Sequence, residues 1–351
     1  MAHLDLDAFF ASVEMLERPE LAAVPLVVGG DPGRRGVVST ANYAARAYGI
    51  RSAMSAAEAW RRCPQAVFVR PRHGLYREYS ERVWDIVAAR VDVVEQVGID
   101  EGYLDLTELV GTAGEAGRLL HDLQAEVMAE TALGGSFGCA TGKTVAKIAS
   151  DHRKPFGITV VPTGREREFL GPLPLRALPG VGPRSEERLA RAGLASIGDL
   201  AGLDDGELAR LVPGSLGPLL RDRARGLDDR PVARERAVRI SIGQEETFDQ
   251  DVDDPVRLHE ELERMIHRVV DHLERDGRGA RTVTAKLRYP DWTLSTRSRS
   301  TPKAVRERAV LVESAHAALE RALADRPPPV RLLGVAVSNL EAERQPRLPG
   351  V

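Results

Sequence analysis

Carboxylates interrupt two apolar segments that have the pattern of buried strands. Asp5 lies in the segment HLDLD, in which apolar and polar residues alternate as in a half-buried strand. Asp100 and Glu101 lie between the apolar extended segments 93–99 and 103–106. A charged group in a core-forming strand is costly unless it is paired or bound to a metal ion. The fold must therefore give each of these carboxylates a partner.

The three carboxylates allow two interpretations. In the first they converge on one sheet edge, where a divalent cation relieves their mutual repulsion. Mg²⁺ prefers one or two protein carboxylates together with substrate phosphates, and two ions about 4 Å apart serve in-line phosphoryl or nucleotidyl transfer. In the second, Asp5 and Asp7 cap the helix that follows, and Asp100 and Glu101 occupy a hairpin turn. For Asp7 we predict the N-cap, because it directly precedes the helical segment 8–16.

Basic residues in two segments suit a phosphate-rich ligand. Tyr43 and Arg46 share one helical face if their segment is helical, and a guanidinium binds phosphate in a bidentate manner. The lysines of the chain are Lys143, Lys147, Lys154, Lys286 and Lys303. A GC-rich genome explains the excess of arginine, so the lysines clustered within residues 143–154 stand out. The alternative for this cluster is a solvated basic helix.

Two glycine-containing segments resemble nucleotide-binding loops without matching them. ATGKT lacks the P-loop spacing, because Phe137 stands where the first glycine belongs and the phosphate cradle depends on loop length. GGDPGRRG lacks the G-x-G-x-x-G spacing of a dinucleotide-binding turn. Neither a Ser/His/Asp pattern nor a histidine-rich metal pattern stands out in the sequence, so the carboxylates are the candidate reactive centre.

The pattern of apolar residues divides the chain into modules. Residues 1–160 alternate strand-like and helix-like segments, which predicts a mixed α/β module around a central sheet. Residues 165–226 predict a small all-helical module, after which a polar linker follows. The remaining residues predict strand, helix, strand, strand, helix and strand, a compact α+β module. The predicted fold class is therefore a multidomain α/β and α+β protein.

Composition and cysteine content indicate a cytoplasmic protein without membrane contact. Apolar residues make up 43% and charged residues 29% of the chain, as in ordinary globular proteins. No apolar run approaches the ~18 residues of a membrane helix. Asp5 and Asp7 interrupt the place where a signal peptide has its apolar core. Cys63 and Cys139 are too few for a disulfide framework or a structural zinc site.

The predicted helical module contains a glycine turn in the segment LPGVGPRSEERL. Gly180 and Gly182 allow a tight turn whose backbone N–H groups face outward at the start of the next helix, which is a natural anion site. A hairpin-helix-hairpin turn of this kind grips a DNA backbone without reading bases. The alternative is a plain loop that connects two helices.

The predicted α+β module carries the densest positive charge. Nine basic and two acidic residues lie between residues 278 and 308, although the net charge of the whole chain is −3. Alternate residues on a strand share a face, so Lys286 lies with Arg288, and Arg297 lies with Arg299. We predict that this strand pair presents one basic face to the backbone of duplex DNA, with Arg281 as a further contact. The alternative is an edge hairpin protected by its charge.

The order of these segments resembles that of the Y-family translesion DNA polymerases, most of all their bacterial DNA polymerase IV branch. The matching segments are LDLDAFFASVE, STANYAARAYGIRSAM, GIDEGYLDLT, VAKIASDHRKPFG, LPGVG and IGQEETF. They occur in order over essentially the whole chain. The resemblance implies a right-handed polymerase with these parts: a palm at 1–10 and 71–164, fingers at 11–70, a helical thumb with the hairpin-helix-hairpin at 165–230, a linker at 231–236, an α+β little finger at 237–342, and a tail at 343–351.

The resemblance also implies an activity and a set of site residues. The activity is template-directed addition of dNTPs to a primer 3′-OH, with low fidelity and no proofreading. The implied ligands of two Mg²⁺ ions are Asp5, Asp100, Glu101 and the carbonyl group of Leu6. The implied nucleotide contacts are Tyr43, Arg46, Lys154, Phe9 and Phe10. Phe10 occupies the steric-gate position that crowds a ribose 2′-OH, although a place in the core beside Phe9 is the alternative.

Some positions depart from the family pattern. Gly98, Gly102 and the pair Thr141-Gly142 stand where Ser, Ala and Pro-Asn are usual. We expect these glycines to loosen the metal-binding hairpin or the turn before the lysine helix, without removing a metal ligand. The tail QPRLPGV only weakly resembles the sliding-clamp peptide Q-L-x-L-F, because Leu348 fits and the final aromatic residue is absent.

The expected partners are primer–template DNA and dNTPs, with the sliding clamp as a weak candidate, and we expect a monomer. Two other functions remain open from the sequence. A non-catalytic DNA-binding accessory protein could retain the polymerase fold, although the intact acidic triad argues against it. A polymerase of this fold could accept ribonucleotides, although Phe10 argues against that.

Overall fold

The computed structural model describes residues 1–212, 214–234 and 238–342. The chain divides into two compact units, Met1–Arg236 and Ala237–Val351, which are described separately. Among the described residues, no helix is both long and apolar enough to cross a membrane. The predicted α/β module and helical module both lie in the first unit, and the predicted α+β module forms the second.

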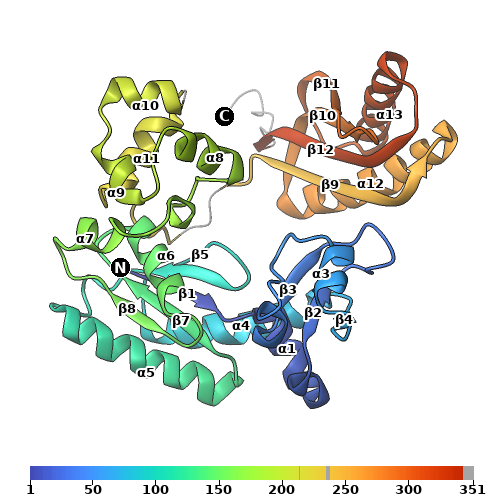
Figure 1. The fold of residues 1–351 in the computed structure, drawn as a ribbon. Coiled ribbons are helices and arrows are strands. Elements are labelled where there is room, and N and C mark those ends of the chain that lie inside the picture. Colours follow the sequence, from blue (N-terminus) through green and yellow to red (C-terminus); the bar gives the residue numbers. More distant parts are fainter. Residues whose placement is uncertain (213, 235–237, 343–351) are drawn as a thin grey trace, which may run out of the picture. The chain divides into compact units, whose positions relative to one another are not determined.

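A mixed sheet lies at the centre of the first unit (Figure 1). Its strands, in spatial order, are β5 (Val94–Gln96), β6 (Glu101–Leu104), β1 (Ala2–Leu6), β7 (Gly135–Cys139) and β8 (Ile158–Val160). β1 is the middle strand and is antiparallel to both β6 and β7. The alternation in HLDLD therefore places Leu4 and Leu6 on one face of the sheet, and His3 and Asp5 on the other.

Helices cover both faces of this sheet. α4 (His73–Arg90) and α5 (Ala113–Thr131) pack on the face of Leu4 and Leu6 and share an apolar core with them. α6 (Lys143–His152) lies on the face of His3 and Asp5. Gly138 of β7 makes this close packing possible, because a Cβ atom there would overlap the carbonyl oxygen of Ala146.

The contact between α6 and β7 can be tested at Gly138. Gly138→Ala is expected to lower the free energy of unfolding by about 1–3 kcal/mol, because an added methyl group must push the helix away from the strand. Denaturant unfolding of the variant measures this loss. Gly114→Ala is the matched control, because a Cβ at this exposed position of α5 would meet only Arg118 Nη1, at 3.8 Å. A Gly138→Ala variant as stable as the control would contradict the direct packing.

A smaller sheet follows β1 along the chain. Its strands, in spatial order, are β3 (Val38–Ala41), β2 (Leu26–Gly29) and β4 (Val67–Val69). The helices of this module are α1 (Phe9–Glu17), the 3₁₀ helix η1 (Pro19–Ala23), α2 (Tyr43–Arg46) and α3 (Ala56–Arg62). The apolar residues of β2, β3 and α3 form a core of their own.

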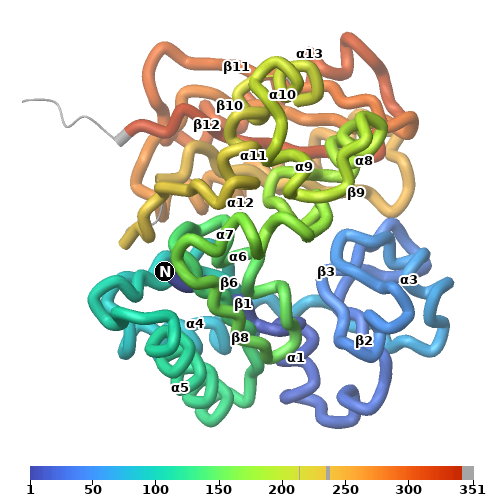
Figure 2. The backbone as a smooth tube through the Cα atoms, turned by 60° about the vertical axis from the view of Figure 1, so that its left-hand side comes forward, coloured from blue at the N-terminus to red at the C-terminus, as the bar shows by residue number. Residues whose placement is uncertain are grey.

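The helical module completes the first unit. It consists of α7 (Glu166–Leu170), the 3₁₀ helix η2 (Leu175–Ala177), α8 (Pro183–Arg191), α9 (Ile197–Gly202), α10 (Asp205–Leu211) and α11 (Leu216–Ala224). Val145, Ile148 and Ala149 of α6 belong to the apolar core of this module. α6 therefore lies between the central sheet and the helical module, as Figures 1 and 2 both show.

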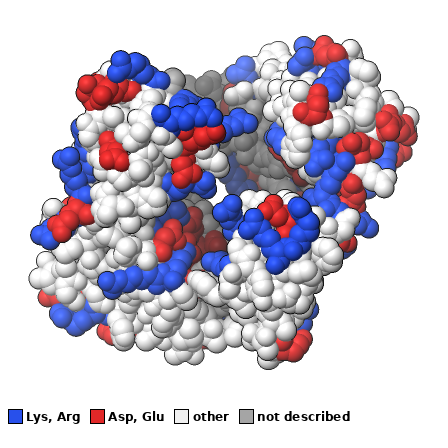
Figure 3. All heavy atoms as spheres, viewed as in Figure 1, with Lys and Arg blue, Asp and Glu red and all other residues white. Residues whose placement is uncertain are grey.

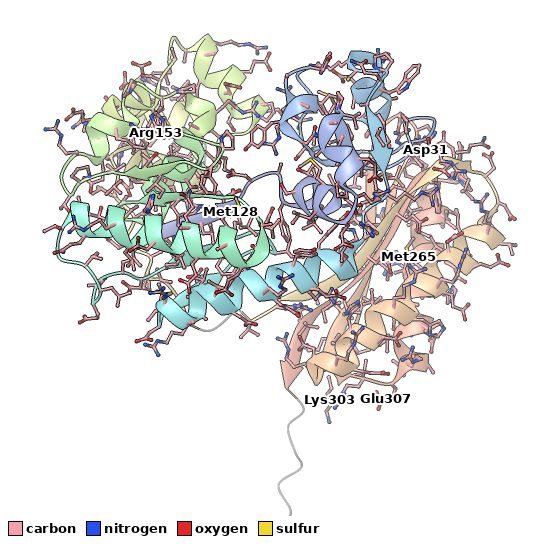
Figure 4. The ribbon with its side chains drawn as sticks, turned by 90° about the horizontal axis from the view of Figure 1, so that it is seen from below. Asp31, Met128, Arg153, Met265, Lys303 and Glu307 are labelled. Carbon is pink, nitrogen blue, oxygen red and sulfur yellow. The ribbon has the colours of Figure 1, made fainter. Side chains whose placement is uncertain are left out.

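The second unit is an antiparallel sheet covered by two helices. The strands, in spatial order, are β11 (Leu294–Val305), β10 (Arg278–Arg288), β12 (Val330–Ala342) and β9 (Ser241–Val252). The helices α12 (Pro255–Asp276) and α13 (Arg308–Asp325) share a core with one face of the sheet. Met265 of α12 is buried in this core, and Lys303 and Glu307 mark the connection from β11 to α13 (Figure 4).

Candidate active site

The sheet register brings the predicted carboxylates together at one end of β1. Asp5 is directly paired with Glu101 of β6 on one side and with Ser136 of β7 on the other. Asp100 lies in the bend that precedes β6, and its carbonyl oxygen accepts a hydrogen bond from the backbone N–H of Leu6 at 2.9 Å. The hairpin turn of the second interpretation is therefore compatible with the first, since the turn between β5 and β6 places Asp100 beside Asp5.

Lysines of α6 and of the turn after it reach these carboxylates. Lys154 Nζ lies 2.6 Å from an oxygen of Asp5 and 2.8 Å from an oxygen of Asp151. Lys147 forms an ion pair with Glu101. The lysine cluster is thus not a solvated basic helix. Two of its members bind the predicted metal ligands, and the third, Lys143, is buried and paired with Glu95.

A cavity of about 220 Å³ lies over Asp5 and Asp100. Acidic, basic, aromatic and hydroxyl side chains surround it. The lining residues are Asp5, Leu6, Ala8, Phe9, Phe10, Ser39, Thr40, Arg46, Ser52, Asp100 and Lys154. Most predicted metal and nucleotide contacts are among them, while Glu101 and Tyr43 are not. The cavity therefore combines two carboxylates, two cationic side chains and two phenylalanine rings.

Burial and mutual repulsion act on the carboxylates of the cavity. Burial raises the pKa of Asp5, and the nearby charge of Lys154 opposes this shift. Burial and the charge of Asp5 raise the pKa of Asp100. Glu101 differs, because the nearby His3 ring and the ion pair with Lys147 lower its pKa to about 2. Asp5 and Asp100 therefore form an anionic pair whose charge a cation would stabilise.

The donor set fits a hard divalent cation. Carboxylate and backbone carbonyl oxygens are the ligands that Mg²⁺ prefers, and Asp5, Asp100 and Leu6 supply both kinds at the cavity. Within the described part of the chain, no three His, Cys, Asp or Glu side chains are already gathered closely enough to hold an ion. The Glu101 carboxylate pairs instead with Lys147 and lies 3.4 Å from His3 Nε2.

Arg46, which lines the cavity, stacks on Tyr43, which lies outside it. They occupy the ends of α2, and the Arg46 guanidinium lies 4.9 Å from the centre of the Tyr43 ring. Arg46 Nε also donates to the carbonyl oxygen of Ala41 at 2.9 Å. Asn42 begins the helix, since its side chain accepts a hydrogen bond from the backbone N–H of Ala45. The predicted shared face of Tyr43 and Arg46 is confirmed.

Asp7 does not cap α1, and this prediction was wrong. Ala8 is the N-cap residue, in a left-handed conformation with φ of 48° and without a side-chain cap. The buried Asp7 carboxylate instead accepts hydrogen bonds from Ser136 Oγ at 3.0 Å, from Phe156 N at 2.7 Å and from the Tyr43 hydroxyl at 3.3 Å. Burial and the charge of Asp7 raise the pKa of Tyr43 to about 12. These donors lie far away in the sequence, so spacing could not reveal them.

Phe10 forms an aromatic wall of the cavity and is held by its neighbours. Its ring stacks on Tyr76 with centres 4.3 Å apart and planes 16° apart, and His73 meets its edge. The Tyr76 hydroxyl donates to the buried carboxylate of Glu14 at 2.7 Å. Arg72 Nε and Nη2 donate to the same carboxylate at 2.9 and 2.8 Å. Phe9, in contrast, is almost fully buried in the core, although it also lines the cavity.

The departures at Gly98 and Gly102 do not leave empty space. A Cβ atom at Gly102 would lie 2.8 Å from the carbonyl oxygen of Glu95 and would overlap the ring of Trp84. A Cβ atom at Gly98 would lie 3.2 Å from Cγ of Glu101 and 3.3 Å from Oδ1 of Asp100. Neighbouring side chains fill the room that the glycines leave, so the expected loosening of the hairpin is not visible in the packing.

The glycine turn of the helical module has the predicted form. Gly180 adopts φ of +104°, a conformation that side chains disfavour, and Gly182 is the N-cap of α8. Pro183 takes the first helical position, where its missing N–H costs nothing. A Cβ atom at Gly182 would meet nothing within 4 Å, so the turn is open on its outer side.

The predicted single basic face in the second unit was wrong. Lys286 pairs with Thr296, whereas Arg297 pairs with Ala285, which faces the helices and is fully buried. Arg297 and Arg299 therefore lie on the helix side, where they pair with Asp325 and Glu313 of α13. Lys286 lies on the opposite face and pairs with Glu245. β11 is also an edge strand, and charges of both signs mingle over the visible surface (Figure 3).

Comparisons with known proteins identify relatives over almost the whole chain. The impB/mucB/samB family model matches residues 4–151, its C-terminal domain model matches residues 239–348, and the IMS family HHH motif matches residues 163–194. A protein named DNA polymerase IV from Halorhodospira halophila is 43% identical over 98% of this chain and 96% of its own length.

Solved structures show the same fold. A Y-family DNA polymerase chimaera superposes with a TM-score of 0.88 at 26% identity, covering 97% of this chain and 99% of that one. An insertion ternary complex of Dbh DNA polymerase, with the same identity and coverage, gives a TM-score of 0.68. The fold and its relatives define a DNA-directed DNA polymerase with a palm, fingers, a helical thumb and a little finger.

The chain belongs to the Y family of DNA polymerases, in the DNA polymerase IV branch. It is a translesion DNA polymerase, and the resemblance seen in its sequence is confirmed. No comparison supports the alternative of a non-catalytic accessory protein.

Proposed function

We propose that the cavity over Asp5 and Asp100 is the site at which this polymerase joins a dNTP to a primer 3′-OH. The observation that carries the proposal is the meeting of two anionic side chains, Arg46, Lys154 and Phe10 around one cavity. When bound, a pair of Mg²⁺ ions would lower the pKa of the attacking hydroxyl group and neutralise the charge of the leaving pyrophosphate. Asp5, Asp100, Glu101 and the Leu6 carbonyl would hold them.

The other residues of the cavity act on the nucleotide. Arg46 and Lys154 neutralise the triphosphate, and Arg46 is already oriented by the Tyr43 ring and the Ala41 carbonyl. Tyr43 contacts the triphosphate from the rim. Glu101 is held by Lys147 and His3, so it joins the metal site only when a cation competes with that lysine.

The proposal keeps the domain boundaries that the resemblance implies. The palm is 1–10 and 71–164, the fingers are 11–70, the thumb is 165–230, and the little finger is 237–342 after a linker at 231–236. The thumb would hold the primer–template backbone at Gly180 and Gly182. Arg281, Lys286, Arg288, Arg297 and Arg299 of the little finger stay predicted DNA contacts. Arg297 and Arg299 would first have to leave their partners on α13.

Three further expectations complete the proposal. The enzyme works as a monomer in the cytoplasm, where its template lies. The tail at 343–351, with its weak similarity to a sliding-clamp peptide, lies outside the described residues. Clamp binding through Leu348 therefore stays a prediction from sequence.

The steric gate can be tested by sugar selection. Wild-type enzyme is expected to extend a primer with dNTPs in the presence of Mg²⁺ and to reject rNTPs. Phe10→Ala is expected to lower the dNTP/rNTP ratio of kcat/KM by about 10- to 100-fold, because removing a ring relieves an overpacking cost of that size. Single-nucleotide incorporation measures the dNTP/rNTP ratio of kcat/KM for the wild-type enzyme and for the variant.

A matched control is Phe68→Ala, since Phe68 lies on β4 and does not line the cavity. The control is expected to keep the wild-type ratio even if it lowers stability. An unchanged ratio in Phe10→Ala would remove the gate. Absence of any Mg²⁺-dependent incorporation by the wild-type protein would overturn the proposed function itself.

A further inference from the structure

The first turn of α6 receives its cap from a distant part of the chain. Gly142 is the N-cap residue and has no side chain to accept the free N–H groups that begin a helix. Asp228 supplies the acceptor, although it lies 84 residues away. One oxygen of its carboxylate accepts from Thr144 N at 2.9 Å and from Thr144 Oγ1 at 2.7 Å. The Asp228 side chain is only 4% exposed.

Asp228 is itself held in place as an anion. Arg230 donates to both carboxylate oxygens, from Nε and from Nη2, each at 2.7 Å. Burial raises the pKa of Asp228, but the hydrogen bonds from Arg230 and Thr144 outweigh it and lower the pKa. A negative charge at a helix N-terminus is favourable, because it faces the positive end of the helix dipole.

A second contact fastens the same segment. Ala233 N donates to an oxygen of Glu95 at 2.6 Å, and the same oxygen accepts from Lys143, the first residue of α6. Gly142 allows the close approach, since a Cβ atom there would lie 3.0 Å from the carbonyl oxygen of Asp228. The segment 228–233 is thus docked on the start of α6 rather than acting as a loose linker.

α6 connects the capped first turn with the residues at the cavity. Lys147, one turn after Thr144, holds Glu101, and Ser150 Oγ lies 2.8 Å from His3 Nδ1. The helix ends just before Lys154, which is paired with Asp5. A frayed first turn would let the helix shift along β7, and both lysines would then move relative to the carboxylates.

We propose that Asp228 is a positioning residue of the active site. By capping α6 from the segment after the thumb, it keeps Lys147 and Lys154 in register with Glu101 and Asp5. The proposal rests on the proposed role of those carboxylates. The same cap could instead contribute only to stability, and the test must separate the two.

The first measurement is independent of metal and of activity. Amide hydrogen exchange of residues 144–146 is followed in the metal-free, full-length protein. Asp228→Ala is expected to speed this exchange about tenfold, because an N-cap deletion costs a helix roughly that factor in its first turn. Asp229→Ala is the matched control, since the neighbouring Asp229 is exposed, and wild-type exchange is expected. Unchanged exchange in Asp228→Ala would overturn the cap.

The second measurement asks whether the cap acts through the lysines. Asp228→Ala is expected to lower kcat about tenfold and to raise the Mg²⁺ concentration that gives half-maximal rate, while KM for the primer–template stays within twofold. In the Lys147→Ala background the same change is expected to lower kcat by clearly less than tenfold, because the part of its effect that acts through Lys147 is already lost and only the part through Lys154 remains. Asp228→Asn keeps the shape of the side chain and one acceptor oxygen, so kcat is expected to fall only about threefold.

Faster exchange with an unchanged kcat and Mg²⁺ requirement would show a purely structural cap and overturn the proposal. Full additivity with Lys147→Ala would do the same. If Asp228→Ala does not fold, Asp228→Asn carries both measurements. Failure of the proposed function is distinguishable, because the wild-type protein would then lack Mg²⁺-dependent synthesis while the exchange result would stand.

Discussion

Replacing Asp100 with asparagine is expected to slow primer extension about a thousandfold. A metal-bound carboxylate contributes several kcal/mol to the transition state, and about 1.4 kcal/mol corresponds to a factor of ten. Asp100 lines the cavity beside Asp5, and burial together with the charge of Asp5 raises its pKa. Asparagine keeps the size of the side chain and removes the charge, so the loss reports on cation binding. Single-turnover incorporation of one nucleotide measures it.

Asp85→Asn is the matched control for this change. Asp85 lies on the exposed side of α4, and full activity is expected. Circular dichroism and thermal unfolding establish that both variants are folded. Incorporation by Asp100→Asn within tenfold of the wild-type rate would exclude Asp100 as a metal ligand.

Glu14→Ala is expected to lower the free energy of unfolding by about 3 kcal/mol. The Glu14 carboxylate is fully buried and accepts from Arg72, Tyr76 and Arg18. Its removal leaves the buried Tyr76 hydroxyl unpaired and strips two arginines of their partner. Both arginines reach water, which keeps the cost below that of a wholly enclosed ion pair. Urea unfolding with the slope held in common measures the difference.

Glu17→Ala is the control, because Glu17 lies on the same helix and also accepts from a tyrosine hydroxyl, that of Tyr79, at an exposed site. Its cost is expected to stay below about 1 kcal/mol. If Glu14→Ala lowered the free energy of unfolding no more than Glu17→Ala does, the buried hydrogen-bond network would not contribute the stability proposed for it.

The hydrogen bonds of Glu14 also make the stability of the protein depend on pH. Burial raises the pKa of Glu14, but the hydrogen bonds from Arg72, Tyr76 and Arg18 outweigh it and hold the pKa below the usual 4.5. The stabilisation is therefore complete above about pH 4.5 and is lost as the pH falls through the folded-state value. Wild-type and Glu14→Ala stabilities should thus converge in acid.

The sequence predicted those parts of the site that follow from local order. Asp5, Asp100 and Glu101 interrupt apolar strands, so the cost of burying a charge made their meeting one of the two interpretations that spacing allowed. Tyr43 and Arg46 share a helical face through their spacing alone. The module order was equally readable, because strand and helix periodicities change at the module limits.

Other residues depend on neighbours that no local pattern reveals. Asp7 binds Ser136 and Phe156, Glu14 binds Arg72, and Asp228 binds Thr144, each across a long stretch of chain. The prediction of a single basic face on the hairpin was wrong for a related reason. Alternation within one strand correctly paired Arg297 with Arg299, but only the register between β10 and β11 determines which face they share.

The position of α6 has a consequence for how such enzymes can be recombined. Its apolar side chains belong to the core of the helical module, while its polar ones serve the central sheet. A crossover between two relatives at residues 153–165 would separate this helix from the side chains with which it interlocks. A crossover beside residue 236, where the first compact unit ends, leaves both cores whole. We therefore expect an exchange at residue 236 to preserve both cores, whereas an exchange at residues 153–165 divides the core that α6 shares with the helical module.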